Sequence, residues 1–452
     1  DGNDVIESGM VYNPGGTDLV NSLQNDDEIN LGAGTDILNV VLGNNNDNGG
    51  TEIAPVLNSV EVVNVEFVSE AGNGVQAGGF TNELNLEFST GTEEVNVDRL
   101  IGDDTGTYSV IGMESSADTL SVSGAPNDAM FEFNYREGAV EGSDDTLNLD
   151  LSGVRLSALD VTIGNRGDTQ EDEEMSFEVV NITTNGSYAN VDAFTFAVDG
   201  DDSNFDALEQ DVTLTLGADT ELNSFSMPGA DSLTVSLGAF DLAITADETD
   251  NSDANTDANG DAVFGMDASD AAFSTANLNS LSITGSGNAV LNGVSGEVVA
   301  SQFDDASLAE DADTSGERYS ENDTGLSVDG SAMTGDLHIS FASSVAADDD
   351  SSVTSGSGSD FIATVGGDMA MDVSTGDGND VVTTLKKGIS NGSVHEFDHG
   401  PWTNSVAVPG EEVLNLEVRD LSGNILASGS AVSTQEDYFL DIAAKWEELV
   451  SE

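Results

Sequence analysis

The sequence predicts an elongated all-β protein, built from β-solenoid or β-roll-like segments and β-sandwich-like strands, with glycine-rich turns and a short C-terminal helix. Three observations predict this class. Short runs of apolar residues alternate with polar ones, glycine- and aspartate-rich motifs recur in a nine-residue register, and a second five-residue motif runs through the middle of the chain.

The strand prediction has to be reconciled with the charge of the chain. The 452 residues include 86 Asp and Glu against 9 Lys and Arg, a formal net charge of -77. Carboxylates about 6 Å apart repel by roughly 0.7 kcal/mol in water, so the chain either stays disordered or takes up cations. Apolar runs such as EVVNVEFV from Glu61, DVTLTL from Asp211 and DSLTVSL from Asp231 favour a folded β protein.

Composition also limits the compartment and the partners. The chain has no Cys, so disulfides do not stabilise it. Free calcium in the cytosol is too low to neutralise this charge, so we expect an extracellular protein. The negative charge excludes nucleic acid and bare anionic lipid as partners, and no apolar stretch reaches the roughly 20 residues that span a bilayer. The opening DGNDVI indicates a piece of a longer protein.

A nine-residue register begins near the N-terminus. The segments TDLVN, DDEIN and TDILN place Asp18, Asp27 and Asp36 nine residues apart, each followed two positions later by an aliphatic residue. This pattern approximates the nonapeptide G-G-x-G-x-D-x-U-x, in which U is a large aliphatic. The glycines allow a tight turn, turn carbonyls and the Asp carboxylate coordinate a hard cation, and the aliphatic is expected to stack on its copies in neighbouring turns.

The same motif returns in SGSGSDFIA and TGDGNDVVT, and DGNDV occurs at both 1–5 and 377–381. We therefore interpret Asp1 as the middle of such a motif. Ordinary Gly/Asp turns between strands are the alternative. The predicted calcium ligands of these motifs are Asp1, Asn3, Asp4, Gly16, Asp18, Asp27, Gly32, Gly34, Asp36, Gly356, Gly358, Asp360, Gly376, Asp377, Gly378 and Asp380.

A further candidate calcium loop lies in the Asp-rich segment 247–270. Alternate oxygen donors closed by a glycine are typical of calcium loops, although Met266 occupies the position where an EF-hand needs Glu. A solvated linker is the alternative interpretation. The alternate donors are Asp253, Asn255, Asp257, Asn259 and Asp261.

The second repeat reads acid, any residue, aliphatic, Asn, aliphatic. Because side chains alternate along a strand, the two aliphatics flanking Asn share one face. Stacked solenoid turns with Asn hydrogen-bonded to its neighbours would explain the pattern, and so would amphipathic strands of a sandwich. The copies lie at 36–40, 61–65, 93–97, 145–149, 178–182 and 412–416.

The segment HEFDH at 395–399 matches the zincin motif H-E-x-x-H, with Glu396 in the place of the base. Zinc-binding histidines at i and i+4 need a helix, whereas Gly392, Gly400 and Pro401 surround this motif. A surface loop is the favoured interpretation, and we expect no enzyme.

The C-terminal segment 433–452 predicts an amphipathic helix. Ser433 and Glu436 form a capping box, and apolar residues follow at helical spacing. We expect this helix to cap the end of a β array, with docking to a neighbouring subunit as the alternative.

The nonapeptides SGSGSDFIA and TGDGNDVVT resemble those of the RTX (repeats-in-toxin) calcium-binding proteins, and residues 32–68 are similar to bacterial S-layer and large surface proteins of that superfamily. The resemblance implies type I secretion from a Gram-negative bacterium, calcium-triggered folding outside the cell, and assembly into a surface lattice or fibre. Two departures are that the repeats are scattered and that HEFDH follows them, whereas serralysin-type proteases place their zinc motif first.

We therefore expect a secreted structural protein that holds several calcium ions and assembles with itself into a surface layer or matrix filament, with cell-surface polysaccharide as a further candidate partner. The alternatives are a segment of a large RTX adhesin, a secreted zinc metalloprotease and a haloarchaeal envelope protein. The expected segments are 1–50, an RTX-like calcium β-roll; 51–245, a β-rich strand-repeat region; 246–270, the Asp-rich loop; 271–350, β-rich; 351–390, a second RTX-like segment; and 391–452, C-terminal strands and the capping helix.

Overall fold

The computed structural model confirms the all-β class: its described residues form strands and no helix, and so contain no helix that could cross a membrane. The predicted C-terminal helix lies outside the described residues, apart from Ser433 at the end of a strand. The structure describes residues 2–16, 19–25, 27–44, 51–69, 81–101, 107–114, 116–125, 129–136, 139–140, 145–164, 177–197, 210–227, 229–245, 273–274, 278–294, 325–341, 351–365, 371–385, 403–408, 411–419 and 425–433.

The chain divides into two compact units. Unit 1 comprises Asp1–Thr245 and Thr275–Gly287, and unit 2 comprises Ala246–Ser274 and Asn288–Glu452. Each unit has its own internal packing.

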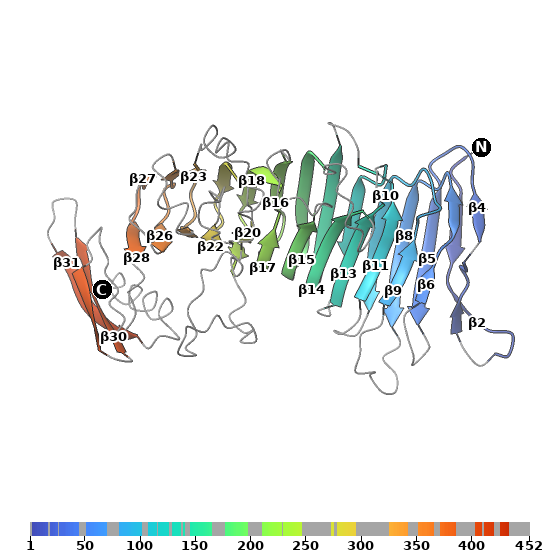
Figure 1. The fold of residues 1–452 in the computed structure, drawn as a ribbon, viewed down its shortest axis with the longest axis horizontal. Coiled ribbons are helices and arrows are strands. Elements are labelled where there is room, and N and C mark those ends of the chain that lie inside the picture. The colour runs from blue at the N-terminus through green and yellow to red at the C-terminus, as the bar shows by residue number, and fades with distance from the viewer. Residues whose placement is uncertain are drawn as a thin grey trace, which may run out of the picture. The chain divides into compact units, whose positions relative to one another are not determined.

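In unit 1, one series of strands pairs in parallel, each strand with the strand one coil further along the chain (Figure 1). We call this series the first ladder. Its coils differ in length: equivalent asparagines lie 25 residues apart in one pair, 32 in the next and 33 in a later one. The strands are β1 (Val5–Ser8), β5 (Ile37–Asn44), β8 (Val62–Ser69), β10 (Glu94–Ile101), β12 (Thr119–Ser123), β14 (Thr146–Ile163), β15 (Val179–Ala197), β16 (Gln210–Leu216), β18 (Ala230–Gly238) and β21 (Ser280–Gly285).

A second ladder of parallel strands runs through the same coils. The long strands β14 and β15 belong to both ladders, and each bends at a glycine with positive φ, Gly153 at 62° and Gly186 at 84°. Glycine adopts this left-handed conformation without the cost that a Cβ atom brings. The other strands of the second ladder are β6 (Thr51–Ile53), β9 (Thr81–Asn85), β11 (Thr107–Met113), β13 (Ala129–Tyr135), β17 (Thr220–Ser226) and β19 (Leu242–Ile244).

The core of unit 1 lies between the two ladders. Phe67 of the first ladder contacts Tyr108 and Phe131 of the second, with ring centroids 5.6 and 5.9 Å apart. All three rings are fully buried. The aliphatic residues of the first ladder stack in register from coil to coil and are also buried, as shown by Leu38 and Val63. The apolar residues of the alternating sequence pattern are therefore the ones that point into the core.

The asparagines of the second repeat form hydrogen-bonded columns on the outward face, as the solenoid interpretation predicts. Asn64 Nδ2 donates to Asn39 Oδ1 at 2.7 Å, and Asn96 Nδ2 donates to Asn64 Oδ1 at 2.9 Å. Asn181 Nδ2 donates to Asn148 Oδ1 at 3.0 Å in a later pair of coils. An amide both donates and accepts, so identical residues in register satisfy one another.

Short strands flank the first coils of unit 1. One pair, β2 (Met10–Tyr12) and β3 (Leu19–Asn21), is antiparallel. The other, β4 (Glu28–Asn30) and β7 (Val56–Asn58), is parallel.

Unit 2 also contains two series of parallel strands. In one series β23 pairs with β25, and β25 pairs with β27. In the other β22 pairs with β24, β24 with β26, and β26 with β28. A separate antiparallel sheet is formed by β29, β30 and β31. The strands are β20 (Phe273–Ser274), β22 (Ala289–Val294), β23 (Ser327–Met333), β24 (Leu337–Phe341), β25 (Ser352–Thr354), β26 (Phe361–Val365), β27 (Asp372–Ser374), β28 (Val381–Leu385), β29 (Thr403–Val408), β30 (Glu411–Arg419) and β31 (Ile425–Ser433).

The parallel pairing within each unit is compatible with a β-solenoid, and it differs from the antiparallel pairing of a sandwich. Five copies of the second repeat lie in the first ladder. The copy at 412–416 is the exception, because it lies in β30, the central strand of an antiparallel sheet. The six-segment division of the chain stays a prediction.

The expected stacking of the nonapeptides is found for the copies at 1–5 and at Asp36, where Ile6 pairs with Leu38, and for the two C-terminal copies, where Ile362 pairs with Val382. It is wrong for the nine-residue series of Asp18, Asp27 and Asp36. The strands that follow Asp18, Asp27 and Asp36 do not pair with one another: β3 pairs with β2, β4 with β7, and β5 with β1 and β8. Val20 is accordingly 36% exposed, whereas Leu38 is fully buried. Spacing along the sequence does not establish stacking here, because coils of 25 to 33 residues separate the paired strands.

We expect Phe131→Ala to lower the free energy of unfolding by about 3–5 kcal/mol, because it removes a buried ring that joins the two ladders. Met130, its neighbour on the outward face, is 40% exposed, so Met130→Ala should change it by about 0.5 kcal/mol or less. Urea unfolding measured by circular dichroism checks both values. Equal losses in the two variants would contradict the placement of the core.

Candidate cation sites at the acidic turns

An acid precedes each of the early strands of the first ladder. Asp4, Asp36, Glu61, Glu93 and Asp118 occupy equivalent positions, because the strands that follow them pair in register. The backbone is continuous through this column: the Ile37 N–H donates to the Asp4 carbonyl at 2.9 Å and the Val62 N–H to the Asp36 carbonyl at 3.0 Å. Neighbouring strands are about 4.8 Å apart, so the acids follow one another closely. We call these five residues the acid column.

Carboxylates of the acid column bind the backbone of the neighbouring coil. The Asp4 N–H donates to Asp36 Oδ1 at 2.7 Å, and the Asp36 N–H donates to Glu61 Oε2 at 2.7 Å. The same contact recurs further along the ladder, where the Asp145 N–H donates to Glu178 Oε2 at 2.7 Å. An N–H that donates to an ionised carboxylate makes a stronger bond than one between neutral groups, so these acids fasten successive coils together.

Asp36 has a second oxygen that this contact does not use. The side chain is fully buried, and Oδ2 has no hydrogen-bond partner among the described residues. Burying an ionised carboxylate with an unsatisfied oxygen is costly, and native proteins usually supply a partner. Asp36 Oδ2 is therefore the first candidate ligand for a cation.

The turns of unit 2 repeat this arrangement at Asp360 and Asp380, with Leu337 in the place of a further acid. The Leu337 N–H donates to Asp360 Oδ1 at 2.8 Å, and the Asp360 N–H donates to Asp380 Oδ1 at 3.1 Å. Asp360 is 1% exposed, and its Oδ2 has no hydrogen-bond partner in the described part of the chain. Two turns in different units therefore have the same unsatisfied buried oxygen.

The glycines of these turns are required by the close approach of successive coils. A Cβ atom on Gly376 would lie 1.6 Å from the Gly356 carbonyl oxygen, and one on Gly378 would lie 1.8 Å from the Gly358 carbonyl oxygen. No side chain fits at these distances. The carbonyl oxygens of one turn thus lie directly against the backbone of the next.

The donors present at these turns fit a hard cation. Each turn has one unsatisfied carboxylate oxygen and glycine carbonyls in the same loop, and calcium takes carboxylate and carbonyl oxygens as ligands. Within the described part of the chain, no group of three or more His, Cys, Asp and Glu side chains is arranged to hold a metal ion. A cation at these turns would therefore depend on carbonyl oxygens for several of its ligands.

The structure brings some of the predicted N-terminal ligands together. The Thr35 N–H donates to Asn3 Oδ1 at 3.1 Å, and a Cβ atom on Gly34 would lie 2.4 Å from the Gly2 carbonyl oxygen. Asn3, Asp4, Gly34 and Asp36 thus belong to two stacked turns, with Gly32 in the same loop as Gly34.

Two other predicted ligands are placed elsewhere. Gly16 lies in the turn that follows β2, where its N–H donates to the Asn13 carbonyl at 2.8 Å. Asp27 precedes β4, and its Oδ2 accepts the Gln24 N–H of its own turn at 2.8 Å. Neither contact joins one coil to the next through the acid column.

In the segment 351–390, Gly356, Gly358 and Asp360 lie in the turn before β26, and Gly376, Asp377, Gly378 and Asp380 lie in the turn before β28. Asp377 is exposed. Several other predicted sites lie outside the described residues: Asp1, Asp18, the HEFDH motif at 395–399, and the calcium-loop candidates Asp253, Asn255, Asp257, Asn259 and Asp261.

Sequence reasoning missed the carboxylates of the acid column beyond Asp36, and the Asp145–Glu178 pair. Their signal was present, because Glu61, Glu93, Asp145 and Glu178 are the acids that open copies of the second repeat. Asp118 opens the related segment DTLSV, in which Ser replaces Asn.

A different column of side chains, which also contains acids, runs along the second ladder. Glu83, Ser109, Glu132, Asp160 and Thr195 are paired in register from β9 to β15. Hydroxyl groups relieve part of the repulsion, since Ser109 Oγ donates to Glu83 Oε2 at 3.1 Å. Burial raises the pKa of Asp160, and a hydrogen bond from the Thr195 hydroxyl opposes that rise.

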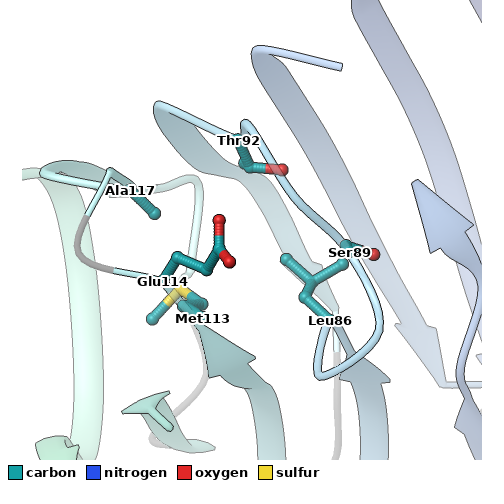
Figure 2. Close-up of a pocket in the computed structure, with 6 residues that line it drawn as sticks. All are labelled: Leu86, Ser89, Thr92, Met113, Glu114 and Ala117. Atoms are coloured by element: carbon teal, nitrogen blue, oxygen red, sulfur yellow. The ribbon is translucent and has the colours of Figure 1, made fainter. Parts of the chain in front are cut away.

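A small hollow lies near the ends of β9 and β11, and its lining side chains are drawn in Figure 2. Its volume is about 10 Å³, room for roughly one water molecule. The Glu114 carboxylate lies at this hollow and forms an ion pair with Arg136. A substrate of ordinary size does not fit there. The lining residues are Leu86, Ser89, Thr92, Met113, Glu114 and Ala117.

No protein-family model, curated protein or solved structure matches this chain.

The raised pKa of Asp160 has a testable consequence for stability. A carboxyl that holds its proton more tightly when folded favours folding below its ordinary pKa of about 3.9, and this contribution is lost as the pH rises through the raised pKa. We expect Asp160→Asn, which stays neutral, to unfold at a higher urea concentration than the wild type at pH 7. The difference between the urea midpoints of the two proteins should become smaller toward pH 3.5. Urea midpoints that run parallel for the two proteins across this range would contradict the assignment.

Proposed function

We propose that this chain is a calcium-dependent extracellular structural protein that assembles with itself into a surface layer or matrix filament. One observation carries the proposal: buried turn carboxylates, Asp36 and Asp360, each keep one oxygen without a partner between stacked coils. A role that depends on bound cations explains why such oxygens are kept in the interior.

Calcium is the cation that suits these turns. It accepts irregular sets of carboxylate and carbonyl oxygens, and sites in extracellular modules bind it at about 0.1–1 mM. Asp36 and Asp360 would each hold a separate ion, and at Asp360 turn carbonyls such as those of Gly356 and Gly358 would supply further ligands. Bound calcium would supply the positive charge that offsets the stacked carboxylates.

The stacking itself supports a structural role. Each coil of a solenoid is stabilised mainly by its neighbours, so many coils together form a continuous and mechanically uniform element. In the absence of calcium, as in a cytoplasm, the charge of -77 would hold the chain unfolded and fit for export by type I secretion. Folding would then follow arrival in a calcium-rich exterior.

The test is to dialyse the purified chain against excess chelator and then return calcium to about 1 mM, following circular dichroism and particle size by light scattering. We expect β-structure and assemblies to disappear in chelator and to return with calcium, while magnesium at the same concentration restores less of either. Survival of both signals in chelator would rule out the calcium mechanism. Calcium-dependent folding without any assembly of the purified chain would favour an adhesin segment instead.

A further inference from the structure

One surface of unit 1 is nearly free of carboxylates, although 86 of the 452 residues are Asp or Glu. It comprises the outward positions of the first ladder from β12 to β21, which form two columns in register. We call it the neutral face. One column contains Thr119, Asn148, Asn181, Thr213, Thr234 and Ser282, and the other contains Ser121, Asp150, Thr183, Thr215, Ser236 and Thr284.

The side chains of the neutral face are half-buried or exposed, and they alternate with buried aliphatic residues such as Leu149 and Ile182. Eleven of the twelve positions are Ser, Thr or Asn. The exception is Asp150, whose Oδ2 accepts a hydrogen bond from Asn185 Nδ2 at 2.8 Å. At the border of the face, Asp211 Oδ1 accepts one from Ser232 Oγ at 2.5 Å.

Neighbouring surfaces of the same unit differ. The earlier coils of the first ladder carry Glu94 on β10 and Glu66 on β8, which pairs with Arg99, among their outward residues. The second-ladder column contains Glu83, Asp160 and the buried Glu132. The neutral face, with one acid in twelve positions, is therefore less acidic than the second-ladder column, in which three of five positions are acids.

Charge decides where two copies of such a protein can meet. Their carboxylates repel at every contact that brings acidic surfaces together, and carboxylates only accept hydrogen bonds. Serine, threonine and asparagine both donate and accept, so a surface made of them is complementary to itself. A symmetric contact needs this property, because each copy presents the same residues to the other.

We propose that the neutral face is the surface through which a second copy of this chain binds in the assembly. The proposal rests on the proposed function and specifies which surface makes the lateral contact. Strands about 4.8 Å apart give the six strands a length of roughly 24 Å, and outward residues are about 7 Å apart along each strand. This footprint is far below the roughly 800 Å² per partner of a stable dimer, so the contact is weak for one pair and becomes effective when repeated in a lattice.

Two matched double variants test the assignment. Thr213→Asp with Thr215→Asp adds two carboxylates to β16 on the neutral face. Ser224→Asp with Ser226→Asp adds two at the same i, i+2 spacing to β17 of the second ladder, where both side chains are half-buried. Circular dichroism and urea unfolding in calcium verify that each variant is folded. A third variant, Asp150→Asn, removes the only carboxylate of the two columns.

Sedimentation velocity over a range of protein concentrations in about 1 mM calcium gives the readout. We expect the β16 variant to need about tenfold more protein than the wild type to assemble, the β17 variant to assemble like the wild type, and Asp150→Asn to assemble at lower concentration. Equal behaviour of the β16 and β17 variants overturns the assignment and leaves the proposed function standing. A wild type that folds with calcium and stays monomeric at every concentration overturns both. If the β16 variant assembles like the wild type but no longer binds a neutral polysaccharide, the assignment of the neutral face to self-contact is also overturned.

Discussion

Parallel pairing in register places equivalent residues of successive coils one above another, about 4.8 Å apart. This constraint favours residues that attract their own kind and penalises those that repel. Aliphatic and aromatic side chains gain buried area by stacking, as Leu38 and Val63 do, and amides satisfy each other, as Asn39 and Asn64 do. Two carboxylates at that separation repel by about 1 kcal/mol in water and by more where water is excluded.

The chain manages its carboxylates by position. Some oxygens accept backbone N–H groups of the preceding coil, which satisfies one side of the carboxylate and fastens the coils, as Asp36 Oδ1 does from the Asp4 N–H. Basic residues neutralise others, as Arg136 does for Glu114. Asp36 and Asp360 each keep one buried oxygen without a partner among the described residues, and the proposed calcium ions would account for these oxygens.

Local patterns predicted the strands and the outward asparagines because both follow from alternation along a single strand. They did not predict which strands pair, since coil length varies and the nine-residue spacing around Asp27 has no equivalent in the pairing. For the same reason the role of Glu61 was missed: its carboxylate acts on the backbone of another coil, 25 residues away. The composition and the motifs therefore indicate that the turns are acidic. Which carboxylate contacts which coil depends on the pairing register of the strands, and the sequence does not give that register.

The most direct test of the central claim compares wild type with Asp36→Asn in calcium and in sodium chloride at matched ionic strength. Asparagine keeps the acceptor for the Asp4 N–H and removes the buried charge. In calcium the free energy of unfolding should be higher for the wild type. In sodium chloride with chelator, where the wild type is expected to lose its β-structure, Asp36→Asn should retain more of it by circular dichroism, because only calcium compensates the unsatisfied oxygen. The same order of stability in both solutions would show that the salt acts by general screening, and would contradict a specific cation at this turn.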